Sequence, residues 1–293
     1  MMGQFQGVHV ALVTPMTEGG DVDSAAIPAL IDYLIDSGIH GIVPLGSTGE
    51  FYALTTAERQ RVVDETIRAV AGRVPVTVGT NGGSTSDAMA HSVYAQEAGA
   101  DAILLAAPYY SLPTADELYE HFAAIEKAID LPIILYNYPG RTGVDLTPAL
   151  VARLAKLPGI QFVKESTGQL ERIPEIQTAC GDSIDVLCGC DALALESFQA
   201  GAVGWITGAA NVLPAELVQL YELHNTGREG DAQQLSARLE SLLAHFEDGL
   251  YTQKVKAGCA LAGHPVGDPR PPLRPLGTSA TETLRLVMEA ARH

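Results

Sequence analysis

The sequence predicts a (β/α)8 barrel with a C-terminal helical extension, an α/β fold. Eight short apolar runs alternate with eight helix-like segments over about 225 of the 293 residues. The apolar runs lack a polar–apolar alternation, as expected for parallel strands that helices cover. The length is also normal for such a barrel with an addition.

Each expected strand ends at a turn or loop signal and is followed by residues with helical spacing. The first helix, for example, carries Ile27, Leu30, Ile31 and Leu34 and ends at Gly38, and Thr55 with Glu58 forms a capping signature for the second. The expected strands span residues 8–13, 41–45, 74–78, 102–106, 132–136, 160–164, 184–188 and 203–207. The expected helices span residues 23–37, 56–72, 86–99, 116–129, 147–156, 170–180, 192–200 and 213–224.

A polar break at residues 226–230 follows the eighth unit. Beyond it, helices are expected over residues 232–247, 252–263 and 280–292, and residues 265–275, with five prolines, form an extended connector. We therefore expect two units, a catalytic barrel over residues 1–225 and a C-terminal helical domain over residues 226–293.

Composition narrows the class of protein. A net charge of -17 argues against nucleic acid and anionic membranes as partners. The chain has four cysteines, which suggest no disulfide framework, and an N-terminus without a leader pattern, so a cytoplasmic location is expected. Cys188-Gly-Cys190 lacks zinc spacing and the eight histidines form no HxxxH or HxH pair, so no metal or other cofactor is expected.

Lys164 is the first candidate for a catalytic residue. The chain has only five lysines, and only this one ends an apolar strand. An ammonium group there is costly unless something uses it, and a buried, uncharged amine can form a Schiff base with a carbonyl substrate. The alternative is a structural lysine that leaves the barrel to pair with Glu165 or Glu50.

Three further features at the ends of two other strands carry candidates, because the loops after the strands form the active face of such barrels. Tyr136 ends the strand beside Lys164 and could relay protons, or be a core tyrosine. The hydroxyls and amides of Gly46-Ser47-Thr48-Gly49-Glu50 suit a carboxylate, or form an ordinary turn, and Glu50 is expected to be a structural buried acceptor. Arg141 could bind a second carboxylate in bidentate fashion, or be a surface arginine.

With GSTGE, YNYPGRTG and VKESTG at barrel spacing, the sequence resembles the dihydrodipicolinate synthase and N-acetylneuraminate lyase family along almost its whole length. The resemblance implies pyruvate-dependent class I aldolase chemistry, in which a lysine imine forms with pyruvate or another 2-keto acid. By this resemblance Lys164 forms the imine, Tyr136 and Ser47 belong to the proton relay, and Thr48 contacts the pyruvate carboxylate.

The resemblance also implies roles for three residues farther from the imine. Tyr110 matches a tyrosine that reaches a neighbouring subunit's site, so the resemblance implies a homo-oligomer, commonly a homotetramer built as a dimer of dimers. Arg141 matches the arginine that the synthases use for the carboxylate of aspartate semialdehyde. Ile206 matches a residue whose carbonyl lies beside the imine.

Some residues depart from the synthase pattern. The synthases usually carry GTTGE followed by a small polar residue, whereas Phe51 and Tyr52 follow GSTGE here, and the Cys188-Gly-Cys190-Asp191 stretch differs as well. Because Arg141 suits an acidic aldehyde, we still expect condensation of pyruvate with an aldehyde, as in the synthases. The alternatives are a 2-keto-3-deoxy sugar acid aldolase or dehydratase of the same family and, more remotely, a non-catalytic barrel that binds a keto acid.

Overall fold

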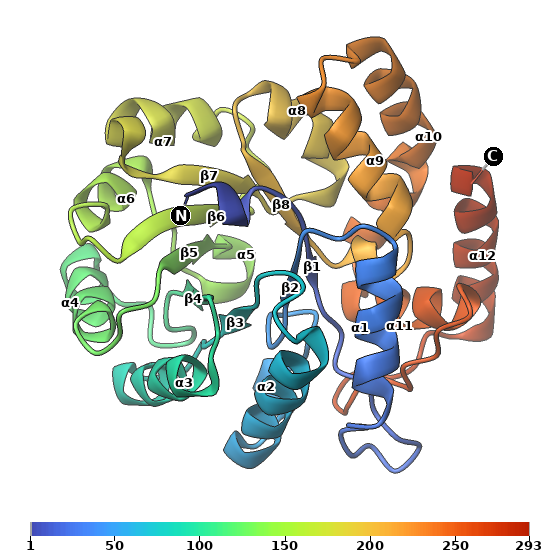
Figure 1. The fold of residues 1–293 in the computed structure, drawn as a ribbon, viewed down its shortest axis with the longest axis horizontal. Helices are drawn as coiled ribbons and strands as arrows, with labels where there is room; N and C mark the ends of the chain where they lie inside the picture. Colours follow the sequence, from blue (N-terminus) through green and yellow to red (C-terminus); the bar gives the residue numbers. More distant parts are fainter. Residues whose placement is uncertain (1, 293) are drawn as a thin grey trace.

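The computed structural model describes residues 2–292 and contains eight parallel strands that form a barrel inside a ring of helices (Figure 1). The strands neighbour one another in the order β2-β1-β8-β7-β6-β5-β4-β3, and a parallel bridge between Ile42 and Val76 joins the two end strands. The predicted fold class is confirmed. The strands are β1 (Gly7–Ala11), β2 (Gly41–Val43), β3 (Thr77–Gly79), β4 (Ala102–Ala106), β5 (Ile133–Asn137), β6 (Ile160–Glu165), β7 (Asp185–Cys188) and β8 (Gly204–Thr207).

Most helices lie within a few residues of their predicted ranges. They are α1 (Ala26–Asp36), α2 (Thr56–Val70), α3 (Thr85–Ala98), α4 (Ala115–Glu126), α5 (Pro139–Thr142), α6 (Pro148–Leu154), α7 (Arg172–Cys180), α8 (Ala194–Gln199), α9 (Pro214–Asn225), α10 (Glu229–Glu247), α11 (Tyr251–Leu261) and α12 (Thr278–Arg292). Short 3-10 helices are η1 (Met2–Phe5), η2 (Phe51–Ala53), η3 (Gly181–Ser183), η4 (Asp191–Leu193) and η5 (Ala209–Asn211).

Two differences from the expected elements have a local cause. Helix α10 begins at Glu229, inside the predicted polar break, because Glu229 and Asp231 place negative charge in its first turn and so suit a helix N-terminus. The one-turn helix α5 lies in a loop where no helix was expected, and it starts with Pro139, whose fixed φ suits a first helical position.

The strands separate two apolar layers. Inward-facing side chains fill the barrel, and Phe5 of η1 closes one end by packing edge-on against Phe162 at 5.2 Å between ring centres. Outward-facing side chains form the larger core between the strands and the helices. Because side chains alternate between these layers along a strand, the parity of a residue decides whether it can reach the barrel interior.

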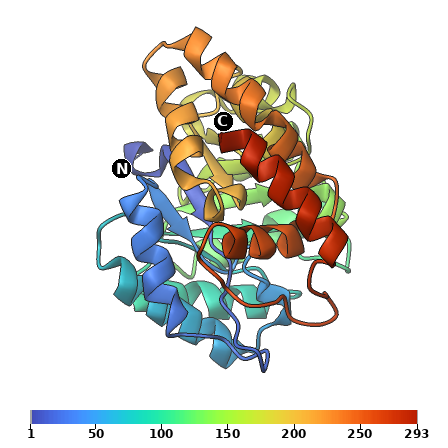
Figure 2. The same ribbon diagram turned by 90° about the vertical axis from the view of Figure 1, so that its right-hand side faces the viewer.

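The C-terminal helices pack onto the barrel beside its seventh and eighth loops. Helix α12 lies along α10 and α11 (Figure 2), while α10 contacts η4 and α11 contacts η5. The extension therefore touches the segments that directly follow β7 and β8. The division into two units at residues 225 and 226 stays a prediction. Within residues 2–292, no helix combines the length and apolar character that crossing a bilayer requires.

Arg270 ties the proline-rich connector to the barrel. Its N–H donates to Glu50 Oε2 at 2.8 Å, and its guanidinium donates to both carboxylate oxygens of Glu58 at 2.7 and 3.0 Å. The same guanidinium also donates to the carbonyl oxygens of Gly20 and Ala53, both at 2.7 Å. Chiefly through the Arg270 hydrogen bonds, the pKa of Glu58 is lowered to about 2.

Arg270→Met should lower the free energy of unfolding by about 1–3 kcal/mol at neutral pH, since bidentate charged hydrogen bonds are lost. The folded pKa of Glu58 is about 2, below its unfolded value. The stabilisation is therefore complete above pH ~4.5 and declines as the pH falls towards 2. Urea unfolding between pH 3 and 7 should show this decline in the parent and a flatter profile in the variant.

Arg285→Met is the matched control, because within residues 2–292 Arg285 pairs only with Glu282 and Glu289 of its own exposed helix face. It should change stability little at any of these pH values. Equal unfolding midpoints for Arg270→Met and Arg285→Met would contradict the role assigned to Arg270.

Candidate active site

Strand parity brings Lys164 and Tyr136 together at the carboxyl end of the barrel. Ile134 and Phe162 face the barrel interior, and Tyr136 and Lys164 lie two residues farther along the same strands. The register pairs Tyr136 with Lys164 directly. The Lys164 Nζ lies 4.5 Å from the centre of the Tyr136 ring, and each residue is 6% exposed. Lys164 and Tyr136, both predicted from the sequence, are therefore buried side by side.

Gly189 leaves room for the Lys164 side chain. A Cβ at this position would lie 2.9 Å from Lys164 Cε and 1.9 Å from Ser166 Oγ, far inside van der Waals contact. The Ser166 hydroxyl in turn donates to the Gly189 carbonyl at 3.1 Å. A larger residue at position 189 would collide with the Ser166 and Lys164 side chains, so this glycine shapes the site.

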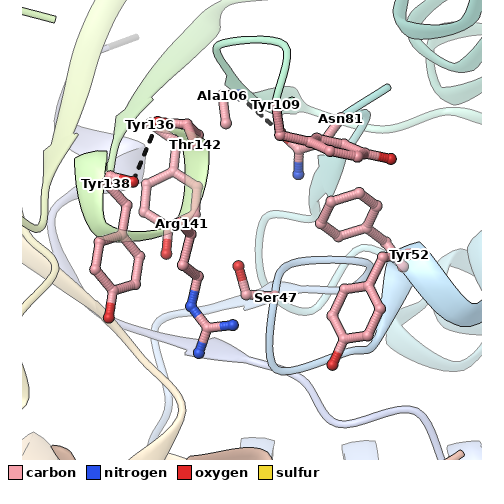
Figure 3. Close-up of a pocket in the computed structure, with 10 residues that line it drawn as sticks. Ser47, Tyr52, Asn81, Ala106, Tyr109, Tyr136, Tyr138, Arg141 and Thr142 are labelled. Carbon is pink, nitrogen blue, oxygen red and sulfur yellow. Dashed lines mark hydrogen bonds between the residues drawn. The ribbon is translucent and has the colours of Figure 1, made fainter. Parts of the chain in front are cut away.

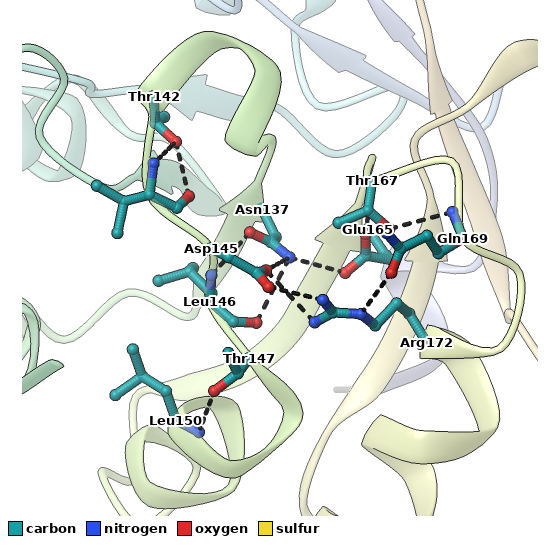
Figure 4. Close-up of polar contacts among 11 residues, drawn as sticks. Asn137, Thr142, Asp145, Leu146, Thr147, Leu150, Glu165, Thr167, Gln169 and Arg172 are labelled. Atoms are coloured by element: carbon teal, nitrogen blue, oxygen red, sulfur yellow. Dashed lines mark hydrogen bonds and ion pairs between the residues drawn. The ribbon is translucent and has the colours of Figure 1, made fainter. Parts of the chain in front are cut away.

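A polar network behind Lys164 occupies Glu165 and removes it as a partner for the lysine (Figure 4). Asn137 Nδ2 donates to Glu165 Oε2 at 3.0 Å and to Asp145 Oδ1 at 3.1 Å, and the Thr167 N–H donates to Glu165 Oε1 at 2.6 Å. Arg172 then pairs with Asp145 at 2.6 Å. These bonds fix the ends of β5 and β6 relative to each other.

Neither carboxylate that was considered as a structural partner pairs with Lys164. Glu50 is completely buried and pairs with Lys256 at 2.7 Å, which agrees with the prediction of a structural buried acceptor. Within residues 2–292, Lys164 makes no ion pair at all. Its amino group therefore faces a cavity of about 330 Å³ instead of a fixed carboxylate partner.

The loop after β2 presents hydroxyls and amides to this cavity. Ser47 and Thr48 line it, and Thr48 is 6% exposed. The N–H groups of Gly49 and Glu50 close the turn on the Gly46 and Ser47 carbonyls, whereas those of Ser47 and Thr48 donate to no acceptor within residues 2–292. Free amides beside hydroxyl groups form a concave donor surface that suits an anion.

The other predicted residues divide into two groups. Arg141 and Ile206 also line the cavity, and the Arg141 guanidinium lies 5.4 Å from the centre of the Tyr138 ring. Tyr110 does not reach the cavity of its own chain. It is 96% exposed and has a left-handed φ of 74°.

Asp191 and Tyr251 complete a wall of the cavity that the sequence analysis did not identify. The Tyr251 hydroxyl donates to Asp191 Oδ2 and accepts from the Gly208 N–H at 3.1 Å, and Trp205 Nε1 donates to Asp191 Oδ1 at 3.1 Å. A Cβ on Gly208 would lie 2.7 Å from the Tyr251 hydroxyl and 2.9 Å from Thr48 Oγ1. The wall is thus packed directly against the loop after β2.

Burial dominates the electrostatics of this wall. It raises the pKa of Asp191, an effect that hydrogen bonds from Tyr251 and Thr207 oppose. Burial and the nearby Asp191 carboxylate keep the pKa of Tyr251 well above its ordinary value, so its phenol stays protonated and serves as a donor. The strand-end pattern that identifies Lys164 and Tyr136 does not extend to Tyr251, because this residue begins α11 in the C-terminal extension.

Glu247 adds a second carboxylate at the cavity surface. Its two oxygens accept the N–H groups of Asp191 and Ala192 at 2.6 and 3.2 Å. The residue as a whole remains exposed, but desolvation of the edge that faces Asp191, together with the Asp191 charge, raises the pKa of Glu247. No group of three or more His, Cys, Asp or Glu side chains within residues 2–292 could hold a metal ion.

The fold and its cavity define a (β/α)8-barrel enzyme, because polar side chains from several strand ends converge at the carboxyl end of the barrel. The family model described as the dihydrodipicolinate synthetase family matches residues 4–291. The chain belongs to this family and is a lyase.

Three relatives illustrate the similarity. A 4-hydroxy-tetrahydrodipicolinate synthase from Pelobacter propionicus is 40% identical over 98% of both chains. A chloride-inhibited dihydrodipicolinate synthase from Acinetobacter baumannii, solved with pyruvate, is 36% identical with a TM-score of 0.93 and covers 98% of this chain and 99% of its own. A monomeric dihydrodipicolinate synthase variant is 31% identical with a TM-score of 0.95 and covers 99% of this chain and 98% of its own.

Tyr251→Phe should lower the free energy of unfolding by about 1–3 kcal/mol, because Asp191 loses one donor and the Gly208 N–H loses its acceptor in a buried place. Urea unfolding at neutral pH measures this change. Tyr94→Phe is the matched control, since the Tyr94 hydroxyl also binds a carboxylate, that of Asp64 at 2.8 Å, but in a partly exposed place. A loss no larger than that of the control would contradict the structural role of Tyr251.

Proposed function

We propose that the chain condenses pyruvate with an aldehyde through an imine on Lys164, the activity of a 4-hydroxy-tetrahydrodipicolinate synthase. The observation that carries this proposal is the buried Lys164 amine, which lacks an ion-pair partner within residues 2–292 and lies against Tyr136. Relatives that share about 40% of the sequence carry this enzyme name, and one related structure contains pyruvate.

The proposed reaction starts with attack of the neutral Lys164 amine on the keto carbon of pyruvate. A C–N bond forms, and loss of water gives the imine. Tyr136 and Ser47 carry the protons of this step, and the Ser47–Thr48 amides and hydroxyls hold the pyruvate carboxylate. Loss of a methyl proton then gives an enamine, because the protonated imine accepts the electron pair.

The enamine carbon attacks the aldehyde carbon, and the carbonyl oxygen of the aldehyde takes up a proton. The amino group of aspartate semialdehyde then attacks the new imine, which closes the ring, breaks the C–N bond to Lys164 and regenerates the lysine; with an aldehyde that lacks an amino group, water hydrolyses the imine instead. Arg141 is exposed at the mouth of the cavity, where a guanidinium can bind a carboxylate carried by the aldehyde, as in aspartate semialdehyde. No metal or other cofactor is part of this proposal.

One observation favours a second candidate, a 2-keto-3-deoxy sugar acid aldolase or dehydratase. The cavity beside Lys164 is lined by Ser166, Thr167 and the Glu247 carboxylate. These groups could bind the hydroxyl groups of a sugar acid chain. Release of pyruvate from such an acid, without condensation of pyruvate and aspartate semialdehyde, would favour this candidate.

We further propose a homotetramer in the cytoplasm, with Tyr110 completing the proton relay of a neighbouring subunit. The four free cysteines fit a reducing compartment. Tyr52, Tyr109, Tyr110 and Leu112 are large apolar side chains left exposed on the single chain, which supports a contact between subunits. One related structure is a monomeric variant, so light scattering of the purified protein is needed to measure the oligomeric state.

Borohydride treatment with pyruvate should add the mass of a reduced pyruvate imine to the peptide that contains Lys164. Lys164→Ala should abolish both this adduct and condensation. Tyr136→Phe should keep the fold and lower kcat by about 10²- to 10⁴-fold, because a proton carrier is lost. Mass spectrometry and a coupled condensation assay with aspartate semialdehyde measure the two effects.

Lys127→Ala is the control for these variants, since Lys127 is an exposed lysine at the end of α4. It should trap pyruvate and turn over as the parent does. Adduct formation that persists in Lys164→Ala would refute the assignment of the imine.

Tyr110→Phe should lower kcat by about 10²-fold without changing the oligomer that light scattering detects. Mixed assemblies of Tyr110→Phe and Lys164→Ala subunits should regain activity, because some sites then combine an intact lysine with an intact tyrosine from a neighbour. A monomeric parent enzyme, or no recovery in confirmed mixed assemblies, would contradict a Tyr110 that acts between subunits.

A further inference from the structure

Glu247 is an acidic group of the Lys164 cavity that the proposed reaction has not used so far. It is the last residue of α10, and it lines the cavity of about 330 Å³ together with Lys164 and Arg141. Helix α10 packs against η4, which directly follows β7, and β6 lies between β5 and β7 in the barrel. In barrel order, Lys164 of β6 therefore lies between the Arg141 loop and the Glu247 carboxylate.

Two backbone N–H groups hold the Glu247 carboxylate in place. Its Oε1 accepts the Asp191 N–H at 2.6 Å, and its Oε2 accepts the Ala192 N–H at 3.2 Å. A carboxylate has about four lone-pair sites, so each oxygen keeps one for another donor. Within residues 2–292, Glu247 forms no ion pair. The anchored carboxylate can therefore accept a hydrogen bond or a proton from a molecule in the cavity.

The other titratable groups around Glu247 are poorer proton acceptors. They are Cys188, Cys190 and Asp191 after β7, Lys164 on β6 and Tyr251 on α11. Asp191 is buried and already accepts hydrogen bonds from Trp205 and Tyr251. Burial raises the pKa of the Cys190 thiol and of the Tyr251 phenol, so both stay protonated. Glu247 is the carboxylate of this group that keeps free lone pairs.

The surroundings of Glu247 also give it a proton affinity that suits a base. Burial of one edge and the Asp191 charge raise the pKa of Glu247 to about 7, against the opposing effects of its two N–H donors and of Lys164. A general base works best when its pKa lies near the working pH. Because the residue as a whole is exposed, a proton that it accepts can pass on to water.

Arg141 supplies the opposite charge at the same cavity. Its side chain extends from α5 toward Ser47 (Figure 3). Arg141 also lines a second, adjoining cavity of about 250 Å³, where the half-exposed Tyr52 and Tyr109 side chains belong to the proposed contact between subunits. A guanidinium and a carboxylate on either side of the lysine match an aldehyde that carries both a carboxylate and an ammonium group, as an α-amino acid does.

We propose that Glu247 is a catalytic residue, which binds the ammonium group of an α-amino acid aldehyde and takes the proton that this group must lose before the ring closes. This inference rests on the proposed Lys164 imine. It assigns the second substrate to the aldehydes whose amino nitrogen can form a six-membered ring with the imine carbon, as that of aspartate semialdehyde can.

The ring-closing step balances without a further reactant. After the C–C bond has formed, the ammonium group gives one proton to Glu247, and the freed electron pair of its nitrogen attacks the imine carbon. A new C–N bond closes the ring, and a proton moves from the ring nitrogen to Lys164 Nζ. The bond from the carbon to Nζ breaks, the ring keeps a C=N bond, and Glu247 gives its proton to water. The product mass equals pyruvate plus the aldehyde minus one water.

Succinate semialdehyde is the matched substrate for the test, because it is aspartate semialdehyde without the amino group, so water must release its product. Glu247→Gln keeps the size of the side chain and removes the proton acceptor. In the full-length protein it should lower kcat with aspartate semialdehyde about 10²-fold and leave kcat with succinate semialdehyde within about twofold of the parent. Chromatography with mass spectrometry measures both products.

Borohydride trapping gives a second readout that a structural role would not change. With pyruvate and aspartate semialdehyde, the Lys164 peptide of Glu247→Gln should accumulate the reduced adduct of both substrates, because ring closure is slow. The parent should accumulate mainly the pyruvate adduct. Glu247→Asp keeps a carboxylate but withdraws it by one methylene, so it should show the same selective loss to a smaller extent.

The pH dependence and a control variant complete the test. The ratio of kcat for aspartate semialdehyde to kcat for succinate semialdehyde should rise in the parent as the pH passes through about 7, where Glu247 becomes a carboxylate. The Lys164 chemistry is common to both aldehydes and cancels in this ratio. The ratio should stay flat in Glu247→Gln. Glu240→Gln makes the same chemical change on an exposed face of α10 and should behave as the parent.

The outcomes separate this inference from the proposed function. A parent that forms no pyruvate adduct on Lys164, or does not condense aspartate semialdehyde, would refute the proposed function itself. In an active parent, equal losses with both aldehydes in Glu247→Gln would show that Glu247 only shapes the loop after β7, and would overturn the present inference alone. Unchanged turnover of aspartate semialdehyde without a trapped adduct of both substrates would overturn it as well.

Discussion

The buried ion pair between Glu50 and Lys256 is the constraint on which the site depends. Both side chains are almost inaccessible, and their charged atoms lie 2.7 Å apart. Glu50 also accepts the Arg270 N–H at 2.8 Å, and Lys256 donates to the Asp268 carbonyl at 3.0 Å. One carboxylate thus joins the loop after β2, helix α11 and the connector before α12. Removing either partner would leave an uncompensated buried charge, which is strongly destabilising.

This constraint accounts for part of the backbone strain in the loops at the carboxyl end of the barrel. Leu45 and Glu50, on either side of the Ser47–Thr48 turn, have left-handed φ values of 60° and 55°. Leu250, just before Tyr251, has a φ of 54°, and Tyr110 and Leu112 also lie in this region of backbone space. Residues with a Cβ adopt it only when their surroundings impose it. The ion pair and the Tyr251–Asp191 hydrogen bond are the interactions that impose it on two of these loops.

The site residues that could be predicted from the sequence are those marked by their position at the end of an apolar run. Lys164 and Tyr136 could be found because each ends an apolar run, and the order of strands in a parallel barrel makes those two runs neighbours. Asn81 also follows a strand, but no local sequence pattern distinguishes it. Its side chain is held by a hydrogen bond from the Ala106 N–H, 25 residues away. Tyr251 was even harder to predict from the sequence, because it contacts Asp191 from α11, a helix outside the barrel.

The two adjoining cavities differ in chemical character, and the hydroxyl groups of Ser47 and Tyr136 line both of them. On the Lys164 side lie the lysine amino group, the Ser47 and Thr48 amides, which have no acceptor within residues 2–292, and the carboxyl groups of Asp191 and Glu247. On the other side lie aromatic rings and a single amide donor. A molecule with net charge -17 attracts anions only through such local groups. A small keto acid therefore suits the first side. Tyr136 and Ser47 line both cavities, and the proposed reaction assigns them the protons that move when the two substrates join.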